Sequence, residues 1–113
     1  MKSKIVALSK NEDFKFLLKQ KKISNKYVTI FFGILSDKNY KMFNISFVTK
    51  KKIGNAVKRN KIKRRLKNIM NDATKKININ LEYCYLLIAK ISVLNDSYKN
   101  IKKTLFNDFE KIK

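Results

Sequence analysis

Several residue types on which protein chemistry often depends are absent or scarce in this chain. It contains no histidine, so no imidazole can serve as a metal ligand or as a general base near neutral pH. A single cysteine, Cys84, excludes a zinc site built from several thiolates and a disulfide within the chain. The 8 acidic residues are scattered, and no Asp-x-Asp pair is present to hold two metal ions. Hydrolytic chemistry carried by the protein's own side chains is therefore not expected.

Long apolar runs are also lacking. The longest run, residues 27–35, is far shorter than the roughly 20 residues that a helix needs to span a bilayer. The first thirteen residues hold a short apolar stretch and then charge, which does not fit a secretory signal with about 7–15 apolar residues. We therefore expect a cytoplasmic protein without a membrane partner, in which Cys84 is reduced and packs as a small apolar side chain.

Positive charge is abundant. The 113 residues suit one domain, and 28 lysines and arginines against 8 acidic residues give a net charge of +20. Hydrophobic residues make up 44% of the sequence, so the chain has enough apolar material to fold and is not expected to be a basic disordered tail. These features predict a single cationic domain over residues 1–113.

Arginine is rare and clustered. Most of the cations are lysines, and Arg59, Arg64 and Arg65 all lie within one short segment. A planar guanidinium binds phosphate through a bidentate fork that an ammonium group does not offer. The cluster therefore points to phosphate or base contacts, with chance placement as the alternative interpretation.

The first half of the sequence predicts a helix and two strands. Ser9 and Glu12 form a capping-box pattern before a helix over residues 10–21. Residues 27–35 and 42–49 are rich in β-forming residues and are separated by turn formers, which favours an antiparallel hairpin. Apolar residues alternate in the second strand, so we expect one of its faces to be core.

A basic amphipathic helix is predicted next. Gly54 and Asn55 can turn the chain into this helix. Its apolar residues recur at helical spacing and form one narrow stripe, namely Ile62, Leu66, Ile69, Met70 and Ala73. The outward residues Asn60, Lys61, Arg64, Arg65 and Lys67 are almost all cationic. Arg59 lies nearer the apolar side, so we expect it in the first turn with its charged head turned outward.

The rest of the chain predicts a linker, a strand and a last helix. Residues 71–80 are polar apart from isolated isoleucines, which suggests a linker or a frayed turn. Residues 83–91 are almost continuously apolar and suit a central strand. Asp96 can cap a final helix whose apolar residues are Tyr98, Ile101, Leu105, Phe109 and Ile112. Together the elements predict one α+β domain.

The segment that begins the basic helix is distinctive. It contains a Lys-x-Gly-x-Ala-Val-x-Arg-Asn pattern, formed by Lys52, Gly54, Ala56, Val57, Arg59 and Asn60 and followed by Lys63-Arg64. This pattern resembles the signature of the bacterial ribonuclease P protein subunit, and residues 11–14, the strand around Phe31 and residues 85–90 resemble other parts of that family. The resemblance implies a single-domain α-β sandwich with a small central sheet and a left-handed β-α-β crossover.

The resemblance also implies a function. In this family a large RNA uses magnesium ions to remove the 5′ leader from precursor tRNA, and the protein assists binding. The chain is thus expected to be a non-catalytic subunit of an endoribonuclease, with the catalytic RNA and precursor tRNA as partners. It would bind no cofactor or metal itself, the magnesium belonging to the RNA-containing holoenzyme. The oligomeric state of the free protein is left open.

Two contact surfaces follow from the resemblance. The basic helix and the loop before it would bind the catalytic RNA through Lys51, Lys52, Lys58, Arg59, Asn60, Lys61, Lys63, Arg64, Arg65 and Lys67. A cleft between the first helix and the sheet would bind the single-stranded leader through Phe14, Leu18, Phe31 and Lys90. The family commonly has arginine at Lys61 and Lys67 and phenylalanine at Leu18, so bidentate contacts and base stacking are expected to be weaker here.

Alternative interpretations stand beside this one. Phe14 and Phe31 also suit ordinary core packing, and the run of cations also suits a solvated helix face. A ribosomal or other RNA-packaging protein would share the charge but not the order of motif and aromatic cleft. A cationic protein of membrane surfaces would use the amphipathic helix on anionic lipid, although its stripe is narrow and the chain has no tryptophan. A protein nuclease would need the histidine and clustered acids that are missing.

Overall fold

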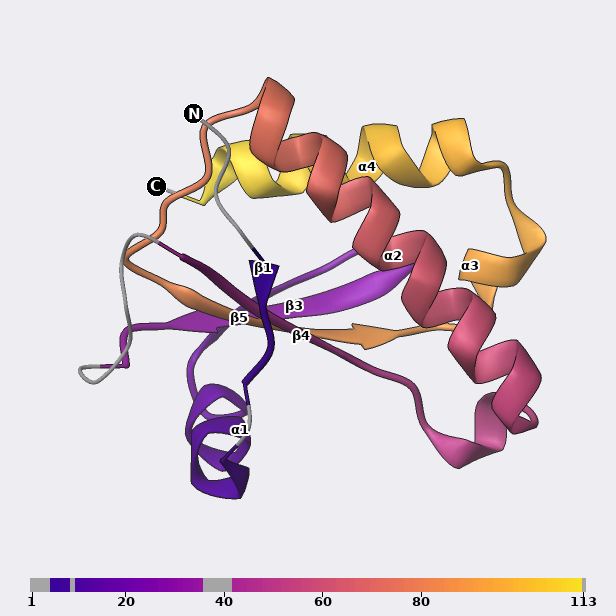
Figure 1. Ribbon diagram of the computed structural model, residues 1–113, viewed down its shortest axis with the longest axis horizontal. Helices are drawn as coiled ribbons and strands as arrows, with labels where there is room; N and C mark the ends of the chain where they lie inside the picture. Colours follow the sequence, from indigo (N-terminus) through magenta and orange to yellow (C-terminus); the bar gives the residue numbers. More distant parts are fainter. Residues whose placement is uncertain (1–4, 9, 36–41, 113) are drawn as a thin grey trace.

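Figure 1 shows a computed structural model of the chain, which describes residues 5–8, 10–35 and 42–112. Its elements are β1 (Ile5–Val6), α1 (Asn11–Leu17), β2 (Lys21–Ser24), β3 (Val28–Gly33), β4 (Phe43–Val48), the 3₁₀ turn η1 (Lys51–Ile53), α2 (Ala56–Lys76), β5 (Cys84–Ala89), α3 (Ser92–Asn95) and α4 (Tyr98–Lys111). The strands form one sheet in the order β1-β4-β5-β3-β2. Helices α2 and α4 lie on one side of this sheet and α1 lies on the other (Figure 1). The predicted α+β class is confirmed.

Strand β5 lies at the centre of the sheet, as its continuous apolar sequence predicted. It is antiparallel to β3 and parallel to β4. The predicted hairpin between residues 27–35 and 42–49 is therefore wrong, because β5 separates these two strands. A strand that is apolar on both faces is best buried in the middle of a sheet, and β5 takes that place. The turn formers of residues 36–39 lie outside the described residues.

The first helix is shorter than predicted, and a strand follows it. Helix α1 ends at Leu17, and Lys21 already pairs with Phe32 in the antiparallel β2–β3 hairpin. The helix has Lys10 at its N-cap without a capping side-chain hydrogen bond, while the expected cap Ser9 lies outside the described residues. Exposed lysines suit β2, which is an edge strand. Gln20, the residue before β2, packs closely against Gly33 of β3. A Cβ on Gly33 would stand 2.8 Å from Gln20 Cγ, so only glycine leaves room for this approach.

Helix α2 connects β4 and β5, which are parallel neighbours, so the three elements form a β-α-β unit. The helix continues to Lys76, and the linker predicted over residues 71–80 is wrong for its first part. Burial explains the extension, because Ala73 continues the apolar stripe and is fully buried. The left hand of this crossover stays a prediction that the resemblance implies.

Two cores lie on the two faces of the sheet, because successive side chains of a strand point to opposite faces. The main core lies between the sheet and helices α2 and α4, and all five residues of the predicted α2 stripe are fully buried in it. The small core lies against α1 and contains Leu8, Leu17, Phe31, Leu35, Cys84 and Leu86. Cys84 is thus a buried free cysteine, as predicted.

The last helix packs as predicted but is capped one residue later. Ile101, Leu105 and Phe109 are buried in the main core. The N-cap is Ser97, whose Oγ accepts a hydrogen bond from Asn100 N at 3.2 Å. The short helix α3 before it was not predicted. In the described part of the chain, no helix is both long and apolar enough to cross a membrane.

Candidate RNA interface

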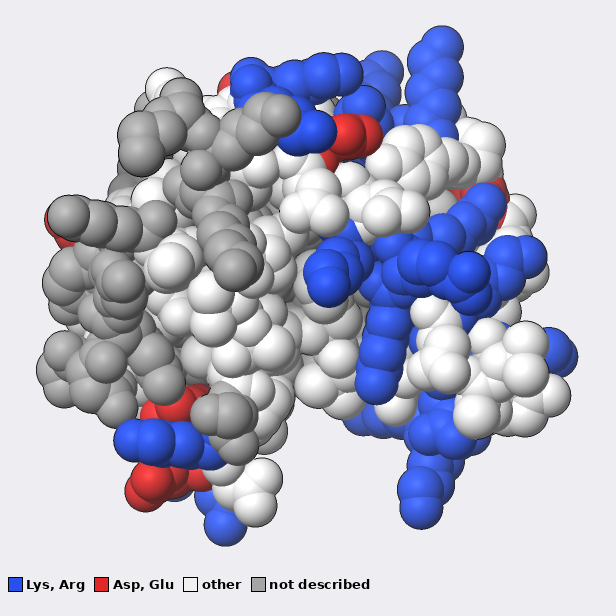
Figure 2. All heavy atoms as spheres, viewed as in Figure 1, with Lys and Arg blue, Asp and Glu red and all other residues white. Residues whose placement is uncertain are grey.

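The outward side of α2 and the turn before it carry a dense group of cations, which we call the basic helix surface. The helix begins where Asn55 Oδ1 accepts a hydrogen bond from Lys58 N at 3.0 Å. Its buried apolar stripe turns the opposite side toward solvent. The exposed cations of this surface are Lys51, Lys52, Lys58, Lys61, Lys63, Arg64 and Lys67. Figure 2 shows lysine and arginine side chains crowded over the region where α2 runs in Figure 1.

Described carboxylates do not neutralise the basic helix surface. The ion pairs found among the described residues are made by Lys26, Lys102 and Lys111, none of which belongs to it. Like charges along one helix face repel each other and destabilise it. An external polyanion removes this repulsion, so the surface is suited to bind one.

Gly54 shapes the turn that leads into the basic helix surface. Its φ of 156° belongs to a region that residues with a Cβ rarely adopt. A Cβ there would also stand 2.9 Å from Lys58 Cδ. The glycine of the motif is therefore required by the backbone, which holds Lys51 and Lys52 next to the first turn of α2.

The three arginines occupy three different environments. Arg64 is exposed, as predicted. Arg65 is half-buried, and its Nη1 donates hydrogen bonds to Val93 O at 2.6 Å and Asp96 O at 3.2 Å. The expectation that Arg65 lies on the outer face needs correction, since α3 and the following loop cover it. Arg59 is half-buried in the first turn, and its Nε is buried without a hydrogen-bond partner among the described residues.

Asp96 organises the loop that receives Arg65. Tyr27 Oη donates to Asp96 Oδ2 at 2.5 Å, while Ser97 N and Asn100 Nδ2 donate to Oδ1 at 2.7 and 2.9 Å. The hydrogen bond from Tyr27 is the largest cause that lowers the pKa of Asp96 to about 2, and it also raises the pKa of Tyr27. The loop is thus tied to the residue that precedes β3 and to α4, which gives Arg65 fixed carbonyl acceptors.

The residues of the predicted leader cleft differ in their exposure to solvent. Phe14 is half-buried on α1, and Leu18, the C-cap residue of that helix, is 47% exposed. Phe31 is only 8% exposed, packs in the small core, and has Lys22 Nζ 5.9 Å from its ring centre. The core-packing interpretation therefore describes Phe31. Lys90 is exposed at the end of β5, where its Nζ donates to Ser24 Oγ at 3.1 Å and Asn25 O at 2.5 Å.

Beyond α1, part of the sheet remains open, and we call this area the open sheet face. Its half-buried side chains Thr29, Val48 and Ile88 are neighbours, because Ile88 is in register with both Thr29 on β3 and Val48 on β4. A pocket of about 400 Å³ at its end is lined by Thr29 and Ile88 together with three lysines, Lys50, Lys52 and Lys90. The sequence interpretation missed Thr29, Val48 and Ile88, since only the pairing of β3, β4 and β5 brings them together.

The order of these elements and the motif on α2 can be compared with known proteins. A family profile described as Ribonuclease P matches residues 3–113. The chain belongs to the ribonuclease P protein family. The ribonuclease P protein component of Mycoplasma mycoides is 34% identical over 113 residues, which are 100% of both chains. That of Listeria monocytogenes is 32% identical over 101 residues, 88% of this chain and 82% of the relative.

Solved structures of ribonuclease P proteins share the fold. The protein from Staphylococcus aureus superposes with a TM-score of 0.75 at 25% identity and covers 94% of this chain and 93% of its own. The protein from Thermotoga maritima gives a TM-score of 0.79 at 20% identity, with 96% and 98% covered. Family membership assigns this ribonuclease P protein a role in tRNA 5′ processing, as a subunit of an endoribonuclease.

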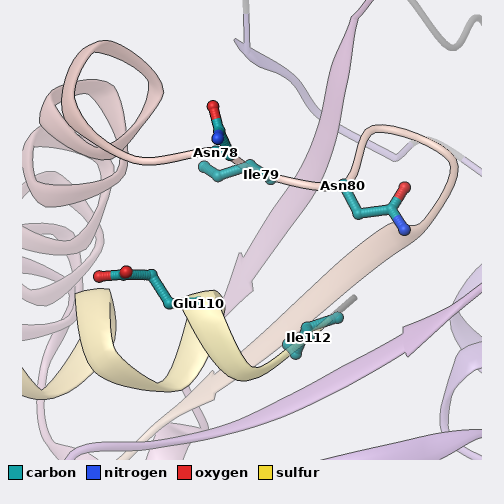
Figure 3. A pocket seen from close by; sticks show the side chains of 5 residues that line it. All are labelled: Asn78, Ile79, Asn80, Glu110 and Ile112. Atoms are coloured by element: carbon teal, nitrogen blue, oxygen red, sulfur yellow. The ribbon is translucent and has the colours of Figure 1, made fainter.

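A further pocket of this ribonuclease P protein lies away from the basic helix surface. In Figure 3, Asn78, Ile79 and Asn80 come from the segment after α2, and Glu110 and Ile112 come from the end of α4. Its described lining carries a carboxylate and no cation, so it does not suit a phosphate. Nowhere in the described residues do three or more acidic, histidine or cysteine side chains gather into a group that could hold a metal ion.

Proposed function

We propose that this chain is the protein subunit of a cytoplasmic ribonuclease P, that it binds the catalytic RNA through the basic helix surface, and that it holds the 5′ leader of precursor tRNA on the open sheet face beside α1. The RNA and its magnesium ions carry out the cleavage, and the protein binds no cofactor of its own. The observation that carries this proposal is the basic helix surface, because none of its cations forms an ion pair with a carboxylate of the described residues.

The charges of this surface support a phosphate-binding role. Each phosphate that a cation neutralises releases counterions. For each such contact, the logarithm of the affinity falls by about 0.7 to 0.9 for every tenfold rise in salt concentration. Seven exposed cations lie on the surface. If all seven contact phosphates, the plot of log affinity against log salt has a slope of about −5 to −6. Asn60 is also exposed and adds an amide group beside these cations.

The open sheet face supports leader binding. A single strand of RNA is bound by a groove that combines apolar or aromatic side chains with cations along the backbone. Here Phe14 lies on α1 and Leu18 caps the C-terminal end of that helix four residues later, while Thr29, Val48 and Ile88 lie on the adjacent sheet. Lys50, Lys52 and Lys90 line the pocket at its end. Phe31 supports this surface from within the small core, so its own ring is hardly available for stacking.

The test is cleavage of precursor tRNA by the purified protein, by its cognate ribonuclease P RNA, and by both together. We expect no cleavage by protein that has been treated with ribonuclease, and a faster reaction of the RNA at low magnesium when the protein is added. Cleavage by the ribonuclease-treated protein, or the absence of any rate increase, would contradict the proposal.

A matched pair of triple variants locates the RNA surface. Replacing Lys61, Arg64 and Lys67 by alanine should abolish the rate increase at low magnesium, because three exposed cations leave the basic helix surface. Replacing Lys99, Lys103 and Lys111 by alanine removes the same charge from exposed positions on α4, outside that surface, and should leave most of the increase. Equal losses in both variants would indicate that net charge, rather than this surface, determines binding.

A further inference from the structure

The basic helix surface and the open sheet face meet at the pocket of about 400 Å³ that lies at the end of the sheet. The walls of this pocket come from two parts of the fold. Lys52 and Ile53 belong to the turn before α2, whereas Thr29 lies on β3 and Lys90 follows β5. The position of α2 relative to the sheet therefore decides how far apart the two proposed RNA contacts lie.

A continuous series of hydrogen bonds joins α2 to the sheet side of the pocket. Arg65 Nη1 donates to Val93 O at 2.6 Å and to Asp96 O at 3.2 Å. Tyr27 Oη donates to Asp96 Oδ2, and Lys90 N donates to Tyr27 O at 2.8 Å. Val93 N also donates to Lys90 O at 3.2 Å, so two routes lead from Arg65 to Lys90. We call this series, formed by Arg65, Val93, Asp96, Tyr27 and Lys90, the hydrogen-bond bridge.

The hydrogen-bond bridge runs partly through the protein interior. Tyr27 is 4% exposed and Val93 is fully buried. Ser92 Oγ donates to Lys26 O at 2.6 Å, which adds a further tie between α3 and the residues before β3. Figure 1 shows α3 beside α2 and close to the end of β5. Because a buried network whose members are satisfied is rigid, the bridge holds these segments in one arrangement.

We propose that the hydrogen-bond bridge fixes the position of the open sheet face relative to the basic helix surface, so that the protein, once bound to the catalytic RNA, presents its leader site at the required distance. The inference rests on the proposed function. Tyr27 and Asp96 are positioning residues in this arrangement, because they act through Arg65 and Lys90 and do not line the pocket. Such positioning matters, since a displacement of about 1 Å far from the reacting atoms can slow a reaction about 100-fold.

Tyr27→Phe interrupts the bridge without changing a charge or the lining of the pocket. It removes only the hydroxyl group that donates to Asp96. The matched control is Tyr98→Phe, which removes a hydroxyl group that donates to the carboxylate of Asp72 at 3.2 Å, outside the bridge. We expect the holoenzyme with Tyr27→Phe to lose about 2- to 30-fold of its preference for leader-bearing precursor over mature tRNA. Tyr98→Phe should keep the preference, and both variants should bind the catalytic RNA as tightly as the parent.

A double-variant cycle tests whether Tyr27 acts through Arg65. Tyr27→Phe and Arg65→Met interrupt the same bridge, so their combined effect on the logarithm of the preference should be smaller than the sum of the two. Tyr98→Phe and Arg65→Met should be additive. A merely structural role of Tyr27 would lower the melting temperature without this difference between the pairs. Should thermal melting show that Tyr27→Phe is unfolded, Asp96→Asn takes its place, because it keeps the size of the side chain and removes the charged acceptor.

The outcomes separate this inference from the proposed function. A parent holoenzyme that binds precursor and mature tRNA equally overturns the leader site and, with it, the inference. If the parent prefers the precursor, a folded Tyr27→Phe variant with unchanged preference overturns the inference alone. Equal losses in Tyr27→Phe and Tyr98→Phe also overturn it, since the cause is then general destabilisation. It is likewise overturned if Tyr27→Phe weakens binding of the catalytic RNA but keeps the preference, because the bridge then shapes only the basic helix surface.

Discussion

The two faces of the sheet are covered very differently. Helices α2 and α4 cover one face and enclose the main core, whereas α1, a helix of 7 residues, covers only part of the other. On that second face Thr29, Val48 and Ile88 stay half-buried. The contrast indicates that the main core provides most of the stability, while the short helix leaves a surface on which we place the leader.

The largest effect is expected from cavities in the two cores. Leu66 and Leu17 are both fully buried, Leu66 in the main core and Leu17 in the small core. Leu66→Ala should lower the free energy of unfolding by about 4–5 kcal/mol, near the upper end for such changes. Leu17→Ala should cost about 2–3 kcal/mol, because the thinly covered α1 can relax into the cavity. Urea denaturation measures both values, and equal losses would refute the contrast between the faces.

A second difference is expected between neighbouring arginines. Arg65→Ala should lower the free energy of unfolding by about 1.5–3 kcal/mol, because it removes the charge-assisted hydrogen bonds to Val93 O and Asp96 O. Arg64→Ala should leave stability within about 0.5 kcal/mol, because its side chain is exposed. In RNA binding the order should reverse, with Arg64→Ala losing a phosphate contact. Denaturation and RNA titration of both variants test this prediction. An Arg65→Ala variant of unchanged stability would show that the hydrogen bonds of Arg65 do not stabilise the fold.

A smaller gain is expected at Leu18. Its side chain, at the C-cap of α1, is 47% exposed, so Leu18→Phe adds a ring without disturbing a core. If the leader lies on the open sheet face, the ring should strengthen holoenzyme binding of leader-bearing precursor by about 1 kcal/mol, the lower end for one stacked base. Affinity for mature tRNA is the control and should not change. A gain for both substrates, or for neither, would place the leader elsewhere.

The smallest effect concerns the loop that fixes Arg65. The pKa of Asp96 is lowered from 3.8 to about 2, chiefly by the hydrogen bond from Tyr27. A carboxyl with a lowered pKa in the folded state stabilises the fold above pH 4, and this contribution is lost as the pH falls through 2. We therefore expect the free energy of unfolding to decline from pH 4 to pH 2, and to decline less in Asp96→Asn. Parallel declines in parent and variant would contradict the assignment.

Elements that depend on local periodicity were predictable from the sequence. The five stripe residues of α2 and the central strand β5 were identified correctly, because helix amphipathicity and an unbroken apolar run are visible along the chain. The motif likewise identified the basic helix surface. The exposure of Lys61, Arg64 and Lys67 follows from their angular distance to the stripe, whereas Arg65, at the border of that arc, was misplaced.

Features that depend on distant segments were not predictable. The hairpin of residues 27–35 and 42–49 was wrong because turn formers say only that the chain reverses, whereas the partner of each strand depends on which burial is best for all strands together. Strand β2 was missed for the same reason, since Lys21 and Lys22 carry no strand pattern and pair only because β3 offers an edge. The open sheet face exists only through these pairings.

The sequence by itself determined the basic helix, its apolar stripe, the glycine turn before it and the family, because each of these depends on residues that are close together in the sequence. Tertiary structure alone decided that Phe31 is core, that Arg65 is held by Val93 and Asp96, and that Phe14 meets Lys63, Arg64 and Lys67 across one pocket. The physical reason is that burial and hydrogen-bond partners are set by packing between segments far apart in the chain, and packing energy is shared among elements rather than carried by any one of them.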